Sequence, residues 1–364
     1  LIQNVSFNFI TDKNLTLINS LNANYQGISI SNGSLNLKRD KQTDIKGKFT
    51  SRFNLNDEEI NQLLAKSNIK FLEKNKINIK GSLLNNFSLN INKNFKLIDY
   101  DYKSKGNISE SQIVLKDNIK SNFIESPIKK ILIHKTNLEI NLNKKNKNFL
   151  MIDGLYNLGG TENKKFKISH DLNKKNPKYL FDLDLAENIF IELINFRTNY
   201  KNGSNIQSEI KFVKDDIIFN YIKFKEEKNS ITINNLKLNS KNELTSISDI
   251  EVQTFKNDIE NNNFKIFFKN KISVIGKTYD TTYLLNQLSN GSKTNLLKNY
   301  TKDIDIKLNS LITKSQISLK NFNLIGKISK GKFEKFSAKS EFSKTEYLDI
   351  SLKTNENNKK ILEV

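Results

Sequence analysis

The residues that could carry acid–base or metal chemistry are few in this chain. Histidine occurs only at His134 and His170, and cysteine is absent. His170 shares the strand phase of the apolar residues Phe166, Ile168 and Leu172, where a histidine with satisfied hydrogen bonds is commoner than a ligand. No second His, Cys or carboxylate cluster stands at metal-ligand spacing near it. We therefore expect neither a metal nor a cofactor.

An acidic pair, Asp182 and Asp184, is the remaining candidate for general acid–base work. The pair alternates with Leu183 and Leu185, so both carboxylates point to the outward face of a predicted strand. A solvated strand face explains such a pair without catalysis. The glycines form no phosphate-binding loop after any strand, and no Gly-x-Ser-x-Gly elbow is present. The sequence predicts a protein that is not an enzyme.

Positive charge is the next feature that could bind a partner. The chain carries 59 Lys and Arg against 39 Asp and Glu, a net charge of +20. Only Arg39, Arg52 and Arg197 are arginines, whereas nucleic-acid readers rely on arginine for bidentate contacts. The lysines are spread along the whole chain, as on a solvated face. We expect no nucleic-acid partner, and polyanion binding through the lysine face is kept as a third hypothesis.

The elements that position the side chains follow the period of a β-strand almost everywhere. Apolar and polar residues alternate over short runs, as at Ile77 and Ile79 or at 138–142. Such alternation is typical of half-buried strands, and roughly 20 runs of this kind can be counted. The only prolines are Pro127 and Pro177, a scarcity that unbroken strands tolerate well.

Two asparagine-containing dipeptides predict tight hairpins between such strands. Asn32-Gly33 lies between alternating isoleucines and leucines in 28–37, and Asn234-Asn235 lies between similar residues in 231–238. Asparagine and glycine tolerate positive φ, which two-residue hairpin loops require. Both dipeptides are therefore expected to reverse the chain.

Two segments predict helices. In the first, Asn56 caps a helix whose first turn holds the acids of 57–59 and whose apolar stripe includes Ile60 and Leu63. In the second, Asp280 caps about two turns over 281–289. Each helix is flanked by strands, so the two units form a loose internal repeat.

These helices are too few to cover both faces of so large a sheet. Open twisted sheets rarely exceed about 10 strands without curling or splitting. We therefore predict a mainly β fold, in which a long, curved antiparallel sheet rolls into an apolar-lined groove with two or three short helices. A conventional sandwich or a β-solenoid has the same periodicity and is the alternative. At about 4.8 Å per strand, side-by-side strands would extend on the order of 100 Å.

We expect residues 1–364 to be one elongated β-rich repeat module and an excerpt of a longer chain. The charged turn at 144–148 and Gly159-Gly160 mark a sub-boundary near 145–165, which gives an N-terminal half at 1–150 and a C-terminal half at 165–364. No apolar run approaches the roughly 18 residues that a membrane-spanning helix needs. Any membrane anchor would therefore lie in a segment that this sequence does not include.

The C-terminal half has a recognisable order of segments. An Asp-Leu strand at 181–188 leads to the connection Ile-Glu-Leu-Ile-Asn-Phe-Arg-Thr at 191–198, and strands follow to 238. A Gly-x-x-x-Asp turn, here Gly276 and Asp280, then precedes a short helix and further strands. This order, over 179–340, resembles the AsmA-like C-terminal region of the AsmA-like family, in particular its YhdP- and TamB-type members. Residues 1–178 resemble this family only in their general strand pattern.

The resemblance implies an inner-membrane-anchored periplasmic protein of a Gram-negative cell envelope. It also implies a groove along which phospholipid passes to the outer membrane, in outer-membrane biogenesis, with the anchor outside this sequence. An apolar lining suits this ligand, because two acyl chains carry roughly 30 methylenes whose exposure to water costs on the order of 25 kcal/mol. The leading hypothesis is a non-enzymatic lipid conduit between the two membranes. The alternative is a structural or adhesin-like extracellular β protein with a closed, dry core.

The residues predicted to line the groove are apolar residues on the inward phase of their strands. They are Ile79, Leu89, Ile91, Leu183, Leu185, Ile210, Phe212, Ile231, Ile233, Leu236, Leu238, Ile272, Val274, Ile306, Leu308, Ile317, Leu319, Ile350 and Leu352. In the alternative, these side chains pack against one another as a closed core.

Overall fold

The computed structural model describes the chain apart from a set of short segments and single residues. The segments left out are residues 1, 65–74, 121–122, 125, 146–147, 173–177, 215, 284–299, 316, 331, 344 and 355–359. Strand accounts for 75% of the chain and helix for 4%, so the fold is mainly β as predicted. Twenty-two strands make up the open, mixed sheet structure, ten in one compact unit and twelve in another.

The two units divide the chain near Ala186. Unit 1 comprises 1–121 and 126–186, and unit 2 comprises 122–125 and 187–364. The stretch 145–165, where the sequence suggested a sub-boundary, lies inside unit 1.

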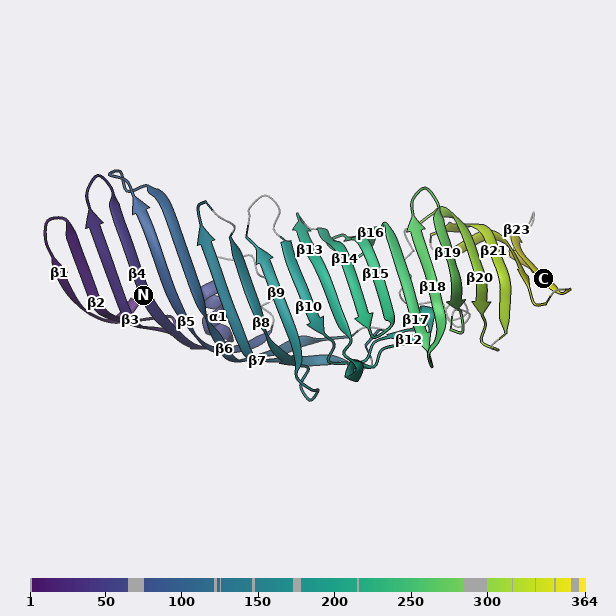
Figure 1. The fold of residues 1–364 in the computed structure, drawn as a ribbon, viewed down its shortest axis with the longest axis horizontal. Helices are drawn as coiled ribbons and strands as arrows, with labels where there is room; N and C mark the ends of the chain where they lie inside the picture. Colours follow the sequence, from purple (N-terminus) through teal and green to yellow (C-terminus); the bar gives the residue numbers. More distant parts are fainter. Residues whose placement is uncertain are drawn as a thin grey trace. The chain divides into compact units, whose positions relative to one another are not determined.

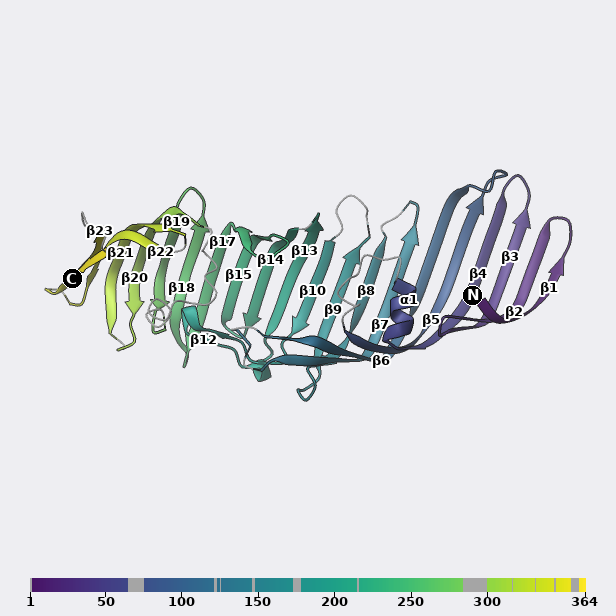
Figure 2. The same ribbon diagram turned by 180° about the vertical axis from the view of Figure 1, so that it is seen from behind.

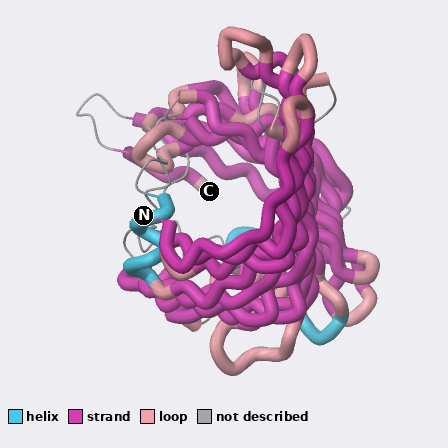
Figure 3. Tube along the Cα trace, turned by 90° about the vertical axis from the view of Figure 1, so that its left-hand side faces the viewer, coloured by secondary structure: helices cyan, strands magenta, loops and turns pink. Residues whose placement is uncertain are grey.

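Unit 1 is an antiparallel meander in which every strand pairs with the next along the chain (Figures 1 and 2). Its strands are β1 (Ile2–Thr11), β2 (Leu15–Tyr25), β3 (Ile28–Arg39), β4 (Thr43–Leu55), β5 (Lys76–Ile91), β6 (Leu97–Ile119), β7 (Ile128–Asn143), β8 (Phe149–Asn157), β9 (Lys164–Asp171) and β10 (Lys178–Asp184). The strands are bent, as the view from the N-terminal side shows (Figure 3).

Unit 2 begins with a connection that contains a two-stranded ribbon and continues as a second strand ladder. The connection holds β11 (Phe190–Ile191), the 3-10 turn Glu192–Ile194, β12 (Phe196–Arg197) and the 3-10 turn Tyr200–Asn202. The ladder consists of β13 (Asn205–Val213), β14 (Asp216–Glu226), β15 (Asn229–Leu238), β16 (Leu244–Ser246), β17 (Asp249–Lys256), β18 (Ile259–Phe268), β19 (Ile272–Asp280), β20 (Lys302–Ile312), β21 (Ser318–Ser329), β22 (Lys332–Glu341), β23 (Tyr347–Thr354) and β24 (Lys360–Glu363).

One strand pair corrects the prediction of a purely antiparallel sheet. Strands β19 and β20 are parallel, with Ile272 opposite Ile304 and Val274 opposite Ile306. A parallel pair requires the chain to cross from one end of the strands to the other, which a tight turn cannot do. The long connection at 281–301 permits this crossing. Most of the helix predicted at 281–289 lies outside the described residues.

The first predicted helix is confirmed as α1 (Asp57–Leu64). The Glu59 amide donates to Asn56 Oδ1, and the Asn56 amide donates to Glu59 Oε2, both over 3.0 Å. This reciprocal capping box satisfies amides that the first turn leaves free. On its apolar side, Ile60 packs with Leu55 and Ile77 of β4 and β5. Helix α1 therefore covers part of one sheet face.

The two predicted hairpins at asparagine dipeptides are wrong. Strand β3 continues without a turn past Asn32, and β15 continues without a turn past Asn235. The φ angles of these two residues are +53° and +50°. The chain reverses before β3, at Gln26-Gly27 between β2 and β3, and not at Asn32. Asn32 lies in a β-bulge, where one extra residue at positive φ is inserted into a continuous strand.

The bulge at Asn32 has a simple sequence cause. Apolar residues stand at 28 and 30 before Asn32 and at 35 and 37 after it, a shift of one residue in the alternation. Without a bulge, that shift would send the second pair to the opposite face. The bulge keeps both pairs on one face and bends the strand. Similar positive-φ residues within strands are Asn4, Ser20, Lys135 and Asn321.

Close packing between neighbouring strands depends on glycine at the bends. A Cβ atom on Gly106 of β6 would lie 2.0 Å from Ser82 O and 2.8 Å from Leu83 Cα, both backbone atoms of β5. Backbone atoms in a sheet cannot move aside as a flexible side chain can. We expect Gly106→Ala to lower the free energy of unfolding by about 1–3 kcal/mol, measured by urea denaturation.

The matched control for this prediction is Asn107→Ala, one residue further along β6 on the exposed face. Its effect should stay within about 0.5 kcal/mol. Equal unfolding midpoints for the two variants would contradict the close approach of β5 and β6.

Candidate functional site: an apolar sheet face in each unit

One face of unit 1 is apolar from strand to strand. Leu89 of β5 lies opposite Ile45 of β4 and Tyr100 of β6, and Ile79 of β5 lies opposite Leu55. At the other end of the unit, Leu183 of β10 lies opposite Phe166. The predicted lining residues Ile79, Leu89 and Ile91 thus share the face of β5 that α1 partly covers.

Most of this face is neither sealed nor fully exposed. Its fully buried apolar side chains in the described chain are few: Ala23, Leu55, Ile77, Leu115 and Phe166. The predicted lining residues of unit 1 are all half-buried: Ile79, Leu89, Ile91, Leu183 and Leu185. The described strands and α1 therefore leave an apolar surface that is only partly covered.

A neutral polar cluster interrupts the apolar face of unit 1. Asn85 is 2% exposed, and its Oδ1 accepts hydrogen bonds from Tyr102 OH at 2.8 Å and Ser104 Oγ at 2.9 Å. Its amide group donates to Ser51 Oγ at 3.0 Å. Satisfied neutral groups of this kind disturb an apolar surface far less than an unpaired charge would.

In unit 2, the pairing register of the strands also places the predicted residues on one sheet face. Ile231 lies between Phe224 and Val252, and Ile233 lies between Ile222 and Ile250. The other half-buried members are Ile210, Leu236, Leu238, Ile306, Ile350 and Leu352. Two predicted residues are exposed, Phe212 at 49% and Ile317 at 48%, the latter just before β21.

Part of the unit 2 face is closed. Ile272 and Ile304 pack with Leu324, Ile328 and Ala338 in a buried cluster. The predicted residues that are fully buried in this unit are Ile231, Ile272, Val274, Leu308 and Leu319. A closed core and a partly accessible apolar face therefore exist side by side within unit 2.

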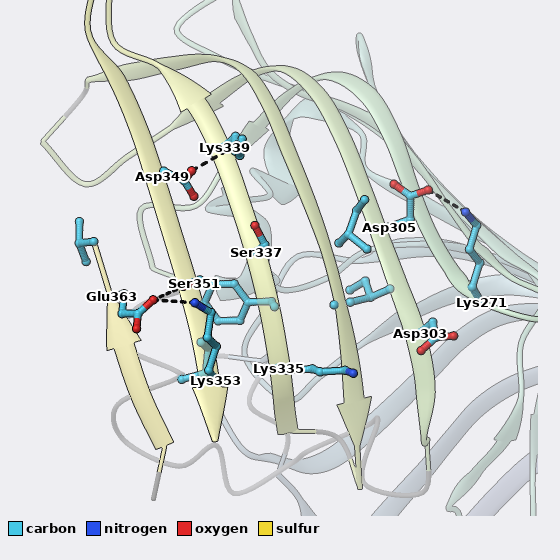
Figure 4. Close-up of a pocket in the computed structure, with 16 residues that line it drawn as sticks. Lys271, Asp303, Asp305, Lys335, Ser337, Lys339, Asp349, Ser351, Lys353 and Glu363 are labelled. Carbon is cyan, nitrogen blue, oxygen red and sulfur yellow. Dashed lines mark hydrogen bonds and ion pairs between the residues drawn. The ribbon is translucent and has the colours of Figure 1, made fainter. Parts of the chain in front are cut away.

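In unit 2, the sheet face opposite the apolar one is polar and carries a hollow. This hollow of about 900 Å³ lies over β19–β24, and three of its lysines, Lys271, Lys339 and Lys353, pair with acids (Figure 4). Lys271 pairs with Asp305 at 2.7 Å, and Lys353 pairs with Glu363 at 2.8 Å, a contact that lowers the pKa of the Glu363 carboxyl. Exposed, mutually neutralised pairs do not define a ligand site.

The acidic pair of the sequence analysis lies on the polar face of unit 1. Asp182 is opposite Lys167, and both Asp182 and Asp184 line a hollow of about 530 Å³. The Tyr156 hydroxyl donates to Asp184 O at 2.7 Å, and burial, helped by the Asp184 charge, raises the pKa of Tyr156 to about 12. This hydroxyl stays protonated at neutral pH, so it does not supply a base to the pair.

His170 is a satisfied inward histidine, as predicted. Its ring stacks on Tyr179 at a centroid distance of 3.8 Å, and Nδ1 lies 3.1 Å from Lys178 O. The described residues contain no group of three or more His, Cys, Asp or Glu side chains placed to hold a metal.

A buried polar cluster in unit 2, centred on Asp280, was missed at the sequence level. Asp280 is 3% exposed and Asn262 is fully buried. Asp280 Oδ2 accepts from Asn195 Nδ2 at 2.9 Å and from Asn261 Nδ2 at 3.3 Å. Its Oδ1 accepts from the Thr282 amide at 3.1 Å. Every one of these partners is a donor, so a side chain with two acceptor oxygens is well matched to the site.

Asn262 links the same cluster to the connection before β13. Its Nδ2 donates to Ile194 O at 2.7 Å and to Thr254 Oγ1 at 2.8 Å, and its Oδ1 accepts from the Asp280 amide. The 191–198 connection is thereby held against the ends of β18 and β19. Residues 276–280, predicted to form a Gly-x-x-x-Asp turn, are instead the end of strand β19, and Asp280 at that end contacts Asn195 of the 191–198 connection.

Glu226 fixes the other end of this connection. It is 3% exposed, and its Oε1 accepts from the Asn199 amide and from Ser204 Oγ, both at 2.7 Å. Phe196 packs against Phe224 nearby, with ring centroids 5.6 Å apart. The connection is therefore a structural clamp built from buried hydrogen bonds.

No family model, no curated protein and no solved structure matches this chain. In the described part of the chain, no helix is both long and apolar enough to cross a membrane.

The hydrogen bonds of Asp280 predict that this side chain contributes to the stability of the fold. Asp280→Asn turns an acceptor into an amide that faces existing donors, so it should lower the free energy of unfolding by about 2–3 kcal/mol. Hydrogen exchange at 187–202 should rise with it. The control is Asp258→Asn, whose side chain is 89% exposed and pairs only with Lys228 in the described chain; it should change stability by at most about 0.5 kcal/mol. Unchanged exchange in Asp280→Asn would refute the clamp.

Proposed function

We propose that this chain is a non-enzymatic lipid conduit whose apolar sheet faces bind the acyl chains of phospholipids. The observation that carries the proposal is the partial burial of the apolar face. In β5, Leu89 is half-buried, while the described chain places no second sheet over it. In β15, Ile233 has isoleucines on both sides and is also half-buried.

Acyl chains are the occupant that best matches such a surface. They are long, flexible and featureless, so they require apolar area and no directional contacts. Each methylene removed from water contributes about 0.8 kcal/mol, and no hydrogen-bonding group of the ligand must be matched. The neutral, satisfied cluster at Asn85 places no charge at that point of the face.

The cellular role follows from the family resemblance and belongs to the same proposal. In this role the protein lies in the periplasm of a Gram-negative envelope, anchored to the inner membrane by a segment outside this sequence. Phospholipid would pass along the apolar-lined groove toward the outer membrane. The resemblance rests on the order of segments over 179–340.

A second candidate is a structural or adhesin-like β protein with a dry core. The observation that favours it is the buried cluster around Ile272 and Ile304, whose apolar side chains pack against one another. In that case the half-buried residues of unit 1 would be covered by protein.

The test is mass spectrometry of lipids extracted from the purified, detergent-free chain. We expect phospholipid in the native protein and less than about one third as much in Leu89→Asp, because a charge on the apolar face repels acyl chains. Ile233→Asp should have the same effect in unit 2.

Matched controls carry the same charge on the opposite face. Leu84 of β5 is 51% exposed and Ile325 of β21 is 69% exposed, so Leu84→Asp and Ile325→Asp should retain the native lipid content. A folded native protein without lipid would refute the conduit and favour the dry core. Equal lipid loss on both faces would also contradict binding at the apolar face.

A further inference from the structure

The turns at the two ends of the unit 1 strands differ in charge. Because the strands form a meander, the turns after β1, β3, β5, β7 and β9 lie at one end, and α1 lies at the other (Figure 1). We call the first set the lysine rim. Its described turn residues include six lysines and two acids: Lys13, Lys41, Lys93, Lys96, Lys144, Lys145, Asp12 and Asp40.

The other end has the opposite balance. Its described connections contain four acids and one lysine: Asp57, Glu58, Glu59, Glu162 and Lys120. A general lysine bias of the sequence would enrich both ends equally. The concentration of lysine at one end is therefore a property of the fold as well as of the composition.

Four lysines of the rim have no acidic partner. Within the described residues, no carboxylate lies within ion-pair distance of Lys13, Lys41, Lys93 or Lys96, whereas Lys145 pairs with Asp99 at 3.4 Å. Turns that join every second pair of neighbouring strands are spaced about 10 Å apart along one end of the strands. The rim thus presents a row of unneutralised positive charge.

The turn between β5 and β6 adds an aromatic side chain to this row. Phe95 is 91% exposed and has a φ of +58°, a left-handed conformation that is unusual for a bulky residue. Asn92 holds the turn rigidly, because its Oδ1 accepts from the Asn94 and Lys96 amides, both at 2.9 Å. The Phe95 amide also donates to Asn92 O at 3.0 Å. A hydrogen-bonded turn therefore places an aromatic ring in solvent, where burial gives no reason for it.

Lys93 and Lys96 flank this exposed ring, and Leu97, 53% exposed, follows. An apolar ring at the tip with lysines beside it suits the boundary of a bilayer, where the ring enters the acyl region and the ammonium groups meet anionic headgroups. A nucleic acid fits less well, because Arg39 is the only arginine near these turns and a single aromatic tip offers no stacking platform.

We infer that the lysine rim of unit 1 is a docking surface for an anionic phospholipid bilayer, with Phe95 as its inserted anchor. This inference does not rest on lipid transport. A protein could dock by this rim without carrying lipid on its apolar face, and the reverse is also possible.

The test is co-sedimentation of the full chain with phosphatidylcholine vesicles, with and without phosphatidylglycerol, at low salt. We expect binding only with phosphatidylglycerol and about tenfold weaker binding for Phe95→Asn. Asparagine tolerates left-handed backbone, so this variant should fold at least as well as the native chain. Since each lysine near an anionic surface contributes on the order of fivefold in affinity, Lys93→Glu/Lys96→Glu should weaken binding by about twentyfold or more.

Two control variants separate the rim from general charge and hydrophobicity. Lys46→Glu/Lys48→Glu makes the same net change on the exposed face of β4 and should weaken binding less than about threefold. Ile259→Asn removes a 71% exposed apolar residue in unit 2 and should leave binding unchanged.

Several results would overturn the inference. These are no binding to phosphatidylglycerol vesicles, native affinity in Phe95→Asn, or equal losses in the two lysine double variants. Rim-dependent binding of a single-stranded oligonucleotide without vesicle binding would assign the surface to nucleic acid instead. Lipid content of the purified chain is a separate readout, so failure of the conduit would leave these results unaffected.

Discussion

The constraint on which this structure depends is that an alternating strand must keep all its apolar side chains on one face. In a long strand, a single extra residue would send the remainder to the wrong side. The chain accommodates such residues as bulges at Asn32 and Lys135, each in the left-handed conformation. The same bulges bend the strands, so one device both preserves the apolar face and curves it.

The apolar sheet face is covered to a different extent in the two units. In unit 1, α1 covers a patch around Leu55 and Ile77 and leaves residues such as Leu89 half-buried. In unit 2, a compact cluster around Ile272 closes part of the face. The Asp280 and Glu226 clusters hold the 191–198 connection in place through buried hydrogen bonds, so the polar contacts organise the ends of the strands while their middles stay apolar.

The strand period, the α1 capping box and the inward phase of His170 could be predicted from the sequence because each depends on local spacing. The asparagine dipeptides were misinterpreted because a turn and a bulge both need positive φ, and because a two-residue hairpin and a bulge both accommodate the one-residue phase shift across Asn32. The parallel β19–β20 pair and the contact of Asn195 with Asp280 join residues far apart in sequence. Alternation alone carries no information about such pairings.

The central claim is that acyl chains occupy the apolar face. The most direct measurement is photocrosslinking with a benzophenone amino acid introduced at Leu89 or at Leu84, on opposite faces of β5, in cells that express the protein. The account predicts covalent phospholipid adducts from position 89 and none from position 84. Adducts to protein alone at position 89, or lipid adducts of equal yield at both positions, would contradict it.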